Sequence, residues 1–293
     1  MQIKRTISNL SLQCIMTEPL YFITSIYTIN PIYRNRLYQL INKFTYKYSK
    51  KDVEHLYHLI QSNEPDHKII EYVISRKSTI KEITMDSKKR GDKFATEWSE
   101  IIPKGKYTNY LDVGCNTGSI TVPFGTKLGL KSANIYGIDI TNFGAQTIKP
   151  LPGFTYTQYD GYHIPHPDEK FDIITCSMVL HHVKYPQILL PEIRRVMKLG
   201  GIILIKEHNA YAPQLEWLIE LEHLLYEVTE SNTTYDEFKK NYYQKLFTRE
   251  TLDDLMLGYG FEKKDVDSER IIRKYYVYNP TKNFYQIYIK KSI

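Results

Sequence analysis

Acids, glycines and histidines recur at the ends of short apolar segments in this sequence. The apolar segment that starts at Tyr110 runs into a glycine-containing turn, and a later one ends at Asp139. Because a carboxylate only accepts hydrogen bonds, Asp139 suits the two hydroxyl donors of a ribose. Imidazole titrates near neutral pH, so His181, His182 and His208 are candidates for a general base. These residue types indicate a nucleoside site with a candidate proton acceptor beside it.

The elements that must position these residues alternate between strand and helix. Residues 110–113 predict a short buried strand, and residues 119–130 predict a helix after the turn. A strand, a glycine turn and a helix present backbone N–H groups at a helix N-terminus, as in nucleotide-binding α/β sheets. The turn has the order Gly114, Asn116, Gly118, which differs from the G-x-G-x-x-G of nicotinamide-binding proteins.

The segment closely resembles motif I of class I S-adenosylmethionine (SAM) methyltransferases, in which an acid precedes x-G-x-G-x-G. Asp112 is the acid, and Asn116 replaces the central glycine. Asparagine is one of the few residues that tolerate positive φ, so we predict that the loop keeps its conformation. The resemblance implies that the following residues contribute to the SAM site: Asp112, Gly114, Cys115, Asn116 and Gly118.

Later segments extend the resemblance to about residues 106–206. It assigns the ribose contact to Asp139, after a predicted strand at 134–139, with Ile140 next to it. In the family, an acid after the third strand accepts from the adenine amino group, and Asp160 and Gly161 match these positions. A fourth strand at 171–176 brings Ser177 to the carboxyl edge of the sheet, where ligands bind in open parallel sheets.

Two further blocks match the same family. Val179-Leu-His-His182 resembles its "VLHH" segment, and Lys198-Leu-Gly-Gly201 resembles its "LKPGG" turn, with Leu199 in place of proline. The resemblance implies an α/β fold with a three-layer Rossmann-like methyltransferase sheet of seven strands, mostly parallel with an antiparallel last strand. His208 follows the fifth strand and is the preferred base, with His182 second; each histidine has a structural alternative.

The remaining segments predict the domain organisation. Residues 1–85 indicate a helical appendage that is basic near its N-terminus, and residues 86–293 indicate the SAM-dependent methyltransferase domain. A helix at 94–101 is expected to carry Trp98 into that domain. Near the C-terminus, two strands at 271–278 and 284–289 are expected to form a hairpin around a turn at Asn279.

Composition limits the location and the cofactors. Three widely spaced cysteines form no disulfide framework or metal cluster, which suits a reducing compartment. Residues 8–29 are too interrupted by polar residues for a membrane span or a signal peptide. We therefore expect a soluble cytoplasmic enzyme that uses SAM, yields S-adenosyl-L-homocysteine and needs no metal. The oligomeric state is left open.

The acceptor is less constrained than the cofactor. Residues 1–51 hold eight basic residues and one acid, a net charge of +7 in a chain whose total is +6. Such a segment could bind RNA, and a solvated helix face explains it equally well. The leading prediction is a small-molecule acceptor methylated on O, N or C, with RNA as the alternative. A third reading is a non-catalytic subunit that binds a partner, which the intact motif acids argue against.

Overall fold

The structure is a computed structural model that describes residues 49–62, 87–142, 149–230, 242–276 and 279–292, with a few single positions before and between these ranges. The chain forms two compact units, one of residues 1–81 and 217–238 and the other of residues 82–216 and 239–293. The second unit contains every residue predicted for the site. The predicted division at residue 85 stays a prediction, and most of the basic segment lies outside the described residues.

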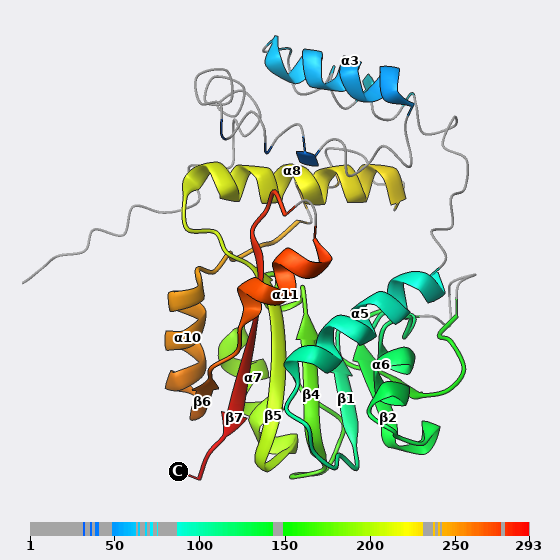
Figure 1. Cartoon of the computed structure of the whole chain (residues 1–293), viewed down its shortest axis with the longest axis vertical. Helices are drawn as coiled ribbons and strands as arrows, with labels where there is room; N and C mark the ends of the chain where they lie inside the picture. The colour runs from blue at the N-terminus through cyan, green and yellow to red at the C-terminus, as the bar shows by residue number, and fades with distance from the viewer. Residues whose placement is uncertain are drawn as a thin grey trace, which may run out of the picture. The chain divides into compact units, whose positions relative to one another are not determined.

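A seven-stranded sheet forms the centre of the second unit (Figure 1). Its order is β3-β2-β1-β4-β5-β7-β6, and β7 runs antiparallel to both of its neighbours while the other neighbouring pairs are parallel. The predicted fold class, with its antiparallel last strand, is confirmed. The strands are β1 Tyr110–Val113, β2 Ile135–Asp139, β3 Thr155–Gln158, β4 Phe171–Ser177, β5 Met197–His208, β6 Phe261–Lys264 and β7 Asn283–Lys290.

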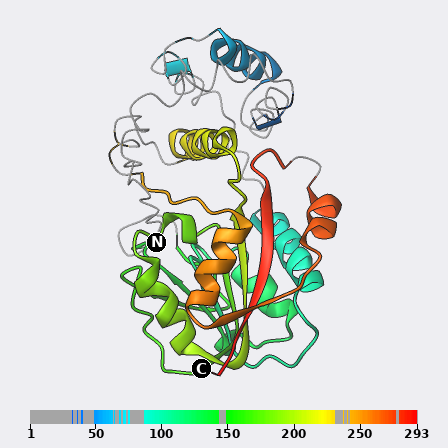
Figure 2. The same cartoon turned by 90° about the vertical axis from the view of Figure 1, so that its left-hand side faces the viewer.

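Helices cover both faces of this sheet, as the two views in Figures 1 and 2 show. One face carries α5 Ser87–Ile101, α6 Thr121–Lys127 and α11 Ser268–Tyr275, and the other carries α7 Pro186–Val196 and α10 Arg249–Gly258. Short 3₁₀ turns are η3 Ser132–Asn134 and η5 Leu180–His182. The helices α3 Lys50–Gln61 and α8 Pro213–Glu230 complete the described elements.

The central strands are apolar on both sides because helices cover both of their faces. In β4, Ile174 packs in the core under α7 and α10, and its neighbour Ile173 packs in the core under α5, α6 and α11. Trp98 of α5 is 1% exposed, and its ring meets that of Phe124 edge-to-face with centroids 5.2 Å apart. The prediction that Trp98 enters the main domain is therefore confirmed.

The predicted C-terminal hairpin is wrong. Residues 268–275 form α11, in which the Asp267 side chain accepts a hydrogen bond from the Arg270 N–H at 2.9 Å and caps the helix. Ile271 and Ile272 are buried on one side of this helix, and charged residues occupy the other side. Residues 283–290 do form a strand, β7, but it pairs with β5 and β6.

Two other boundaries differ from the predictions. The helix after the glycine turn is shorter than expected, because it ends at Lys127 before Gly129, whose φ is +78°. The predicted turn at 198–201 lies within β5. The register between β4 and β5 shifts there, because Phe171 pairs with Met197 and Ile173 pairs with Ile202. Gly200 has φ +74° in this bulge. A bulge inserts extra residues without ending the strand.

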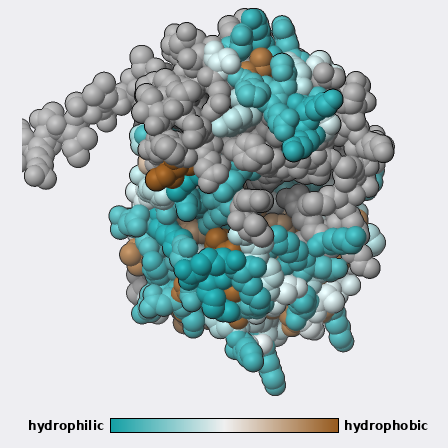
Figure 3. Space-filling model, turned by 45° about the horizontal axis from the view of Figure 1, so that its top comes forward, coloured by the Kyte–Doolittle hydropathy of each residue, from teal (hydrophilic) through white to brown (hydrophobic). Residues whose placement is uncertain are grey.

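The face of the molecule drawn in Figure 3 is mainly polar where it is coloured. In Figure 3 hydrophilic residues cover most of the coloured face, and hydrophobic residues form separate spots. Scattered apolar side chains of this kind are normal on protein surfaces and need no special explanation. Among the described residues, no helix combines the length and apolar character that crossing a membrane requires.

Candidate active site

The glycine loop after β1 has the backbone that the sequence predicts. Gly114, Asn116 and Gly118 have φ values of +74°, +46° and +81°. A Cβ on Gly114 would lie 2.3 Å from Val179 Cγ2, and one on Gly118 would lie 2.3 Å from Phe154 Cε1. Both glycines are therefore required by sterics as well as by φ. Asn116 adopts the positive φ that we predicted it to tolerate.

Asp139, the last residue of β2, holds this loop. Its Oδ2 accepts a hydrogen bond from the Asn116 N–H at 2.8 Å, and its Oδ1 accepts from the N–H and the hydroxyl of Thr141 at 3.0 and 2.7 Å. Asp139 is 9% exposed. The structure thus brings together two predicted site residues that are 23 positions apart in the chain. A carboxylate fixed in this way is a preorganised acceptor at the sheet edge.

Asp112 lies inside the fold. It is 5% exposed, and the hydroxyls of Thr121 and Thr175 each donate to one of its oxygens at 2.6 Å. These bonds join β1 to the first turn of α6 and to β4. Removal from water, opposed by these two hydrogen bonds, raises the pKa of Asp112 to about 6. Asp112 was predicted as a cofactor ligand, and its two oxygens here support the loop.

The raised pKa of Asp112 predicts a pH-dependent contribution to stability. The folded state keeps the proton to a higher pH than the unfolded chain, so this contribution to the free energy of unfolding falls as pH rises from about 4 to about 6. The loss is at most about 3 kcal/mol. We expect the difference in unfolding free energy between the wild type and Asp112→Asn to shrink from pH 4.5 to pH 7.5 in urea titrations. A constant difference would contradict the shifted pKa.

The cysteine and the isoleucine of the predicted site differ sharply in exposure. Cys115 is 6% exposed, and its thiol donates to the Asn116 carbonyl at 3.4 Å. Burial is the main reason that the pKa of this thiol is raised, so it stays protonated. Ile140 is 66% exposed and follows Asp139 directly. An exposed apolar side chain beside a fixed carboxylate is suited to packing against one face of a planar ring.

Asp160 follows β3 and binds its own turn. Its Oδ1 accepts from the N–H groups of Tyr162 and His163, both at 2.7 Å, and its Oδ2 lies 2.6 Å from His163 Nδ1. The bond to the His163 ring, and then those to the backbone N–H groups, lower the pKa of Asp160 to about 2. Gly161 has φ +90°, and a Cβ there would lie 3.4 Å from Ile140 Cγ2. The ends of β2 and β3 therefore lie side by side.

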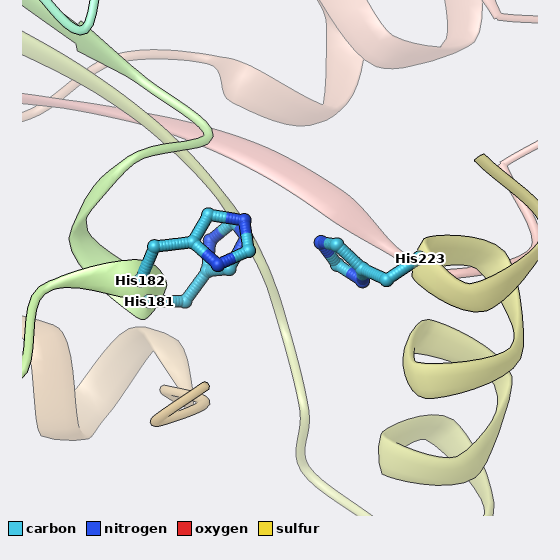
Figure 4. A group of neighbouring side chains, drawn as sticks. All are labelled: His181, His182 and His223. Carbon is cyan, nitrogen blue, oxygen red and sulfur yellow. The ribbon is translucent and has the colours of Figure 1, made fainter. Parts of the chain in front are cut away.

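The histidines gather at the ends of β4 and β5. Glu207 Oε2 lies 2.5 Å from His181 Nδ1, and both side chains are 1% exposed. The His181 ring centroid lies 4.1 Å from that of His182 and 5.4 Å from that of His208. Figure 4 shows His181 and His182 extending from the same turn. His223, also drawn there, lies in the part of α8 that belongs to the other unit, and its Nδ1 lies 2.7 Å from the Ile219 carbonyl oxygen.

The two candidate bases differ in exposure. His208 is 2% exposed, whereas His182 is an exposed residue. Partial removal of the His182 ring from water, and then the neighbouring His181, lower the pKa of His182 to about 4. His182 Nδ1 lies 3.2 Å from the Tyr243 carbonyl oxygen, and its ring lies edge-on to Tyr242 with centroids 6.0 Å apart. Ser177 ends β4 next to this group and pairs with Lys206 of β5. The structure thus brings the predicted histidines together at one edge.

Glu207 and the two threonines that bind Asp112 are the supporting residues that sequence reasoning missed. Glu207 directly precedes His208 in the sequence. Strand alternation gives no signal for the burial of Glu207, because the second half of β5 is buried on both faces. Thr121 and Thr175 give no signal either, because a single threonine in a strand or a helix is common.

The sheet order, the antiparallel β7 and the glycine loop against Asp139 define the class I SAM-dependent methyltransferase fold. Residues 66–266 match the family described as "Methyltransferase domain". This match spans more than half of the chain, and the chain belongs to that family.

Individual relatives share shorter segments. The chain is 29% identical over 101 residues to the demethylmenaquinone methyltransferase of Lysinibacillus sphaericus, covering 33% of this chain and 43% of the relative. It is 33% identical over 104 residues to an uncharacterized protein of Methanocaldococcus jannaschii, covering 36% and 45%. The matched segments thus span less than half the length of these two relatives. A solved SAM-dependent methyltransferase from Mesorhizobium loti has 15% identity and a TM-score of 0.48, covering 68% of this chain and 98% of its own.

Proposed function

We propose that this protein transfers the methyl group of SAM to a nucleophilic O, N or C atom of a small-molecule acceptor. The observation that carries the proposal is the position of Asp139, whose carboxylate binds the glycine loop at the carboxyl edge of the sheet. The histidine group lies at the ends of the neighbouring strands β4 and β5. Donors, acceptors and candidate bases thus occur along one edge, where ligands of open α/β sheets bind.

The residues at this edge fit the chemical groups of SAM. Asp139 would accept hydrogen bonds from the ribose hydroxyls, because a carboxylate is an acceptor-only group facing two donors. Ile140, 66% exposed, would cover one face of the adenine ring. Asp160 and Gly161 follow the adjacent strand and would meet the polar edge of adenine. The backbone around Gly114 to Gly118 would border the amino-acid end.

Bound SAM supplies an electrophilic methyl group on a sulfonium, and the chain contributes position and proton transfer. His182 is the base that we favour, because it is an exposed residue while His208 is 2% exposed. The pKa of His182, lowered to about 4, keeps its ring neutral and able to accept a proton at neutral pH. His182 would take the proton of an acceptor hydroxyl or amine. Glu207 supports it indirectly by binding His181 and the Leu180 N–H, at 2.9 Å, and so fixing the turn that carries His182.

A small acceptor is favoured over RNA by what the relatives do. One of them is a demethylmenaquinone methyltransferase, and another, from Xanthomonas oryzae, is a ubiquinone and menaquinone biosynthesis C-methyltransferase. Both names denote small-molecule acceptors. The RNA alternative depended on the basic residues 1–51, and no comparison supports it. The non-catalytic alternative gains no support either, because the loop conformation and the Asp139 contact are intact.

Replacing His182 with glutamine is expected to lower turnover by about a hundredfold or more, because general-base catalysis contributes that much. Glutamine keeps a polar side chain of similar reach but accepts no proton. SAM affinity should stay within about twofold, measured by calorimetry. His208→Gln is the matched comparison and is expected to lower turnover less. A larger loss in His208→Gln would transfer the role of base to that residue.

The proposal is tested by incubating the protein with methyl-labelled SAM and a cell extract divided by size. We expect label in the fraction of small molecules, in amounts that depend on the protein. Label in nuclease-sensitive material would replace the proposed acceptor class with nucleic acid. Binding of SAM without any transfer of label, across extracts from several sources, would contradict the proposed activity.

A further inference from the structure

Lys206 and Glu207, adjacent residues near the end of β5, send their side chains to opposite faces of the sheet. Their partners in β7 are Tyr285 and Phe284, which belong to the two different cores. Lys206 is 4% exposed and Glu207 is 1% exposed. Lysine and glutamate are almost never buried to this degree unless they have partners. The hydrogen-bond partners of Lys206 and Glu207 therefore show which elements each side chain holds on its face of the sheet.

On one face, Glu207 holds the turn after β4. Its two oxygens bind the Leu180 N–H and the His181 ring, so η5 is fixed to β5 at two points. The backbone of Lys206 adds a third point, because its carbonyl accepts from the Met178 N–H at 2.8 Å. Val179 follows Met178, and its side chain fills the space beside Gly114 of the glycine loop.

On the other face, Lys206 is connected to α5 through tyrosine. Its Nζ donates to the Tyr276 hydroxyl at 2.7 Å. The hydroxyls of Tyr276 and Tyr285 donate to Glu97 Oε2 at 3.0 and 2.7 Å, and Glu97 is completely buried. Because an ammonium only donates and a carboxylate only accepts, the Tyr276 oxygen must accept from Lys206 while its proton points to Glu97. The ammonium also lies 4.3 Å from the centre of the Phe94 ring.

The same helix contacts the end of the glycine loop. A Cβ on Gly91 of α5 would lie 2.0 Å from the Ser119 carbonyl oxygen, so the helix backbone approaches this loop closely. Ser119 follows Gly118 directly. Gly91 and Phe94 are three residues apart and share one face of the helix. A connection that fixes Phe94 and Glu97 therefore also fixes the part of α5 that touches the loop.

We propose that Lys206 and Glu207 form a two-sided clamp that positions the glycine loop for SAM. In this clamp Lys206 is a positioning residue that acts through Tyr276 and Glu97 on α5, while Glu207 holds η5. The inference rests on the proposed function, since it names residues that serve the same cofactor site. It assigns a role to a buried ammonium that is not among the predicted ligands.

The clamp is tested with Lys206→Met, which removes the ammonium but keeps an unbranched side chain, and with Tyr276→Phe, which removes only a hydroxyl. Each variant is expected to raise the dissociation constant of SAM by about tenfold in calorimetry. The double variant should be no weaker than the worse single variant, because both changes break one connection. Lys264→Met, which alters an exposed lysine of β6, is the matched control and should bind SAM as the wild type does.

Hydrogen exchange separates positioning from a general loss of structure. We expect faster exchange in α5 of both variants and unchanged exchange in α10 on the opposite face. Variants that bind SAM as the wild type does, or that leave α5 exchange unchanged, would overturn the clamp. If the wild-type protein itself binds no SAM, the proposed function fails, and the clamp fails with it. If the wild-type protein binds SAM and the variants bind it equally well, only the clamp fails.

Discussion

Replacing Asp139 with alanine is expected to weaken SAM binding by roughly tenfold to a hundredfold. The carboxylate would accept hydrogen bonds from the ribose hydroxyls, and bonds to a charged group contribute about 1.5–3 kcal/mol. The substitution also removes the acceptor of the Asn116 N–H, 2.8 Å away, and so loosens the glycine loop. Calorimetric titration with SAM measures the effect directly.

Two controls make the Asp139 result specific. Asp139→Asn keeps the shape and one acceptor oxygen, and it should fall between the wild type and Asp139→Ala. Asp265→Ala removes an exposed acid between β6 and α11 and should leave the affinity unchanged. If Asp139→Ala binds SAM as tightly as the wild type while remaining folded, Asp139 is not the ribose ligand.

Replacing Glu207 with glutamine is expected to lower both stability and turnover. Glu207 is 1% exposed and binds His181 and the Leu180 N–H. Glutamine is nearly the same size but loses the charge that strengthens both bonds, so we expect a destabilisation of about 1.5–3 kcal/mol in urea unfolding. Turnover should fall by about tenfold or more, because the turn that carries His182 would lose its fixed position.

The matched control for Glu207 is an ion pair at the surface. Glu269 pairs with Arg249, and its side chain is 56% exposed. Exposed ion pairs contribute about 0–1 kcal/mol, so Glu269→Gln should leave stability and turnover nearly unchanged. Equal effects of the two substitutions would show that the burial of Glu207 has no special consequence.

Much of the fold could be predicted because local signals agreed with the global pattern. β1 and β4 are short apolar segments, and the first ends at a turn that needs positive φ. Asn116 fits this turn because asparagine tolerates that conformation. β1 pairs in parallel with both β2 and β4, as expected for strands that are buried on both faces. The apolar segments, the glycine and asparagine residues of the turn and the spacing of the motifs all indicated the same architecture.

The wrong C-terminal hairpin and the contacts that the sequence did not predict have physical reasons as well. Ile271-Ile-Arg-Lys-Tyr-Tyr contains many strand-favouring residues, but the cap from Asp267 and the burial of the two isoleucines on one side favour a helix. Neither the Lys206–Tyr276–Glu97 connection nor the threonine contacts of Asp112 follow from any local pattern. They join residues up to 179 positions apart, which meet only once the sheet is assembled.

The measurement that tests the central claim most directly is a calorimetric titration of the wild-type protein with SAM, repeated with S-adenosyl-L-homocysteine. We predict saturable binding of each at one site per chain. SAM binding should be weakened in Asp139→Ala and preserved in Asp265→Ala. Absence of binding by the folded wild-type protein at millimolar SAM would contradict the assignment of this sheet edge as a SAM site.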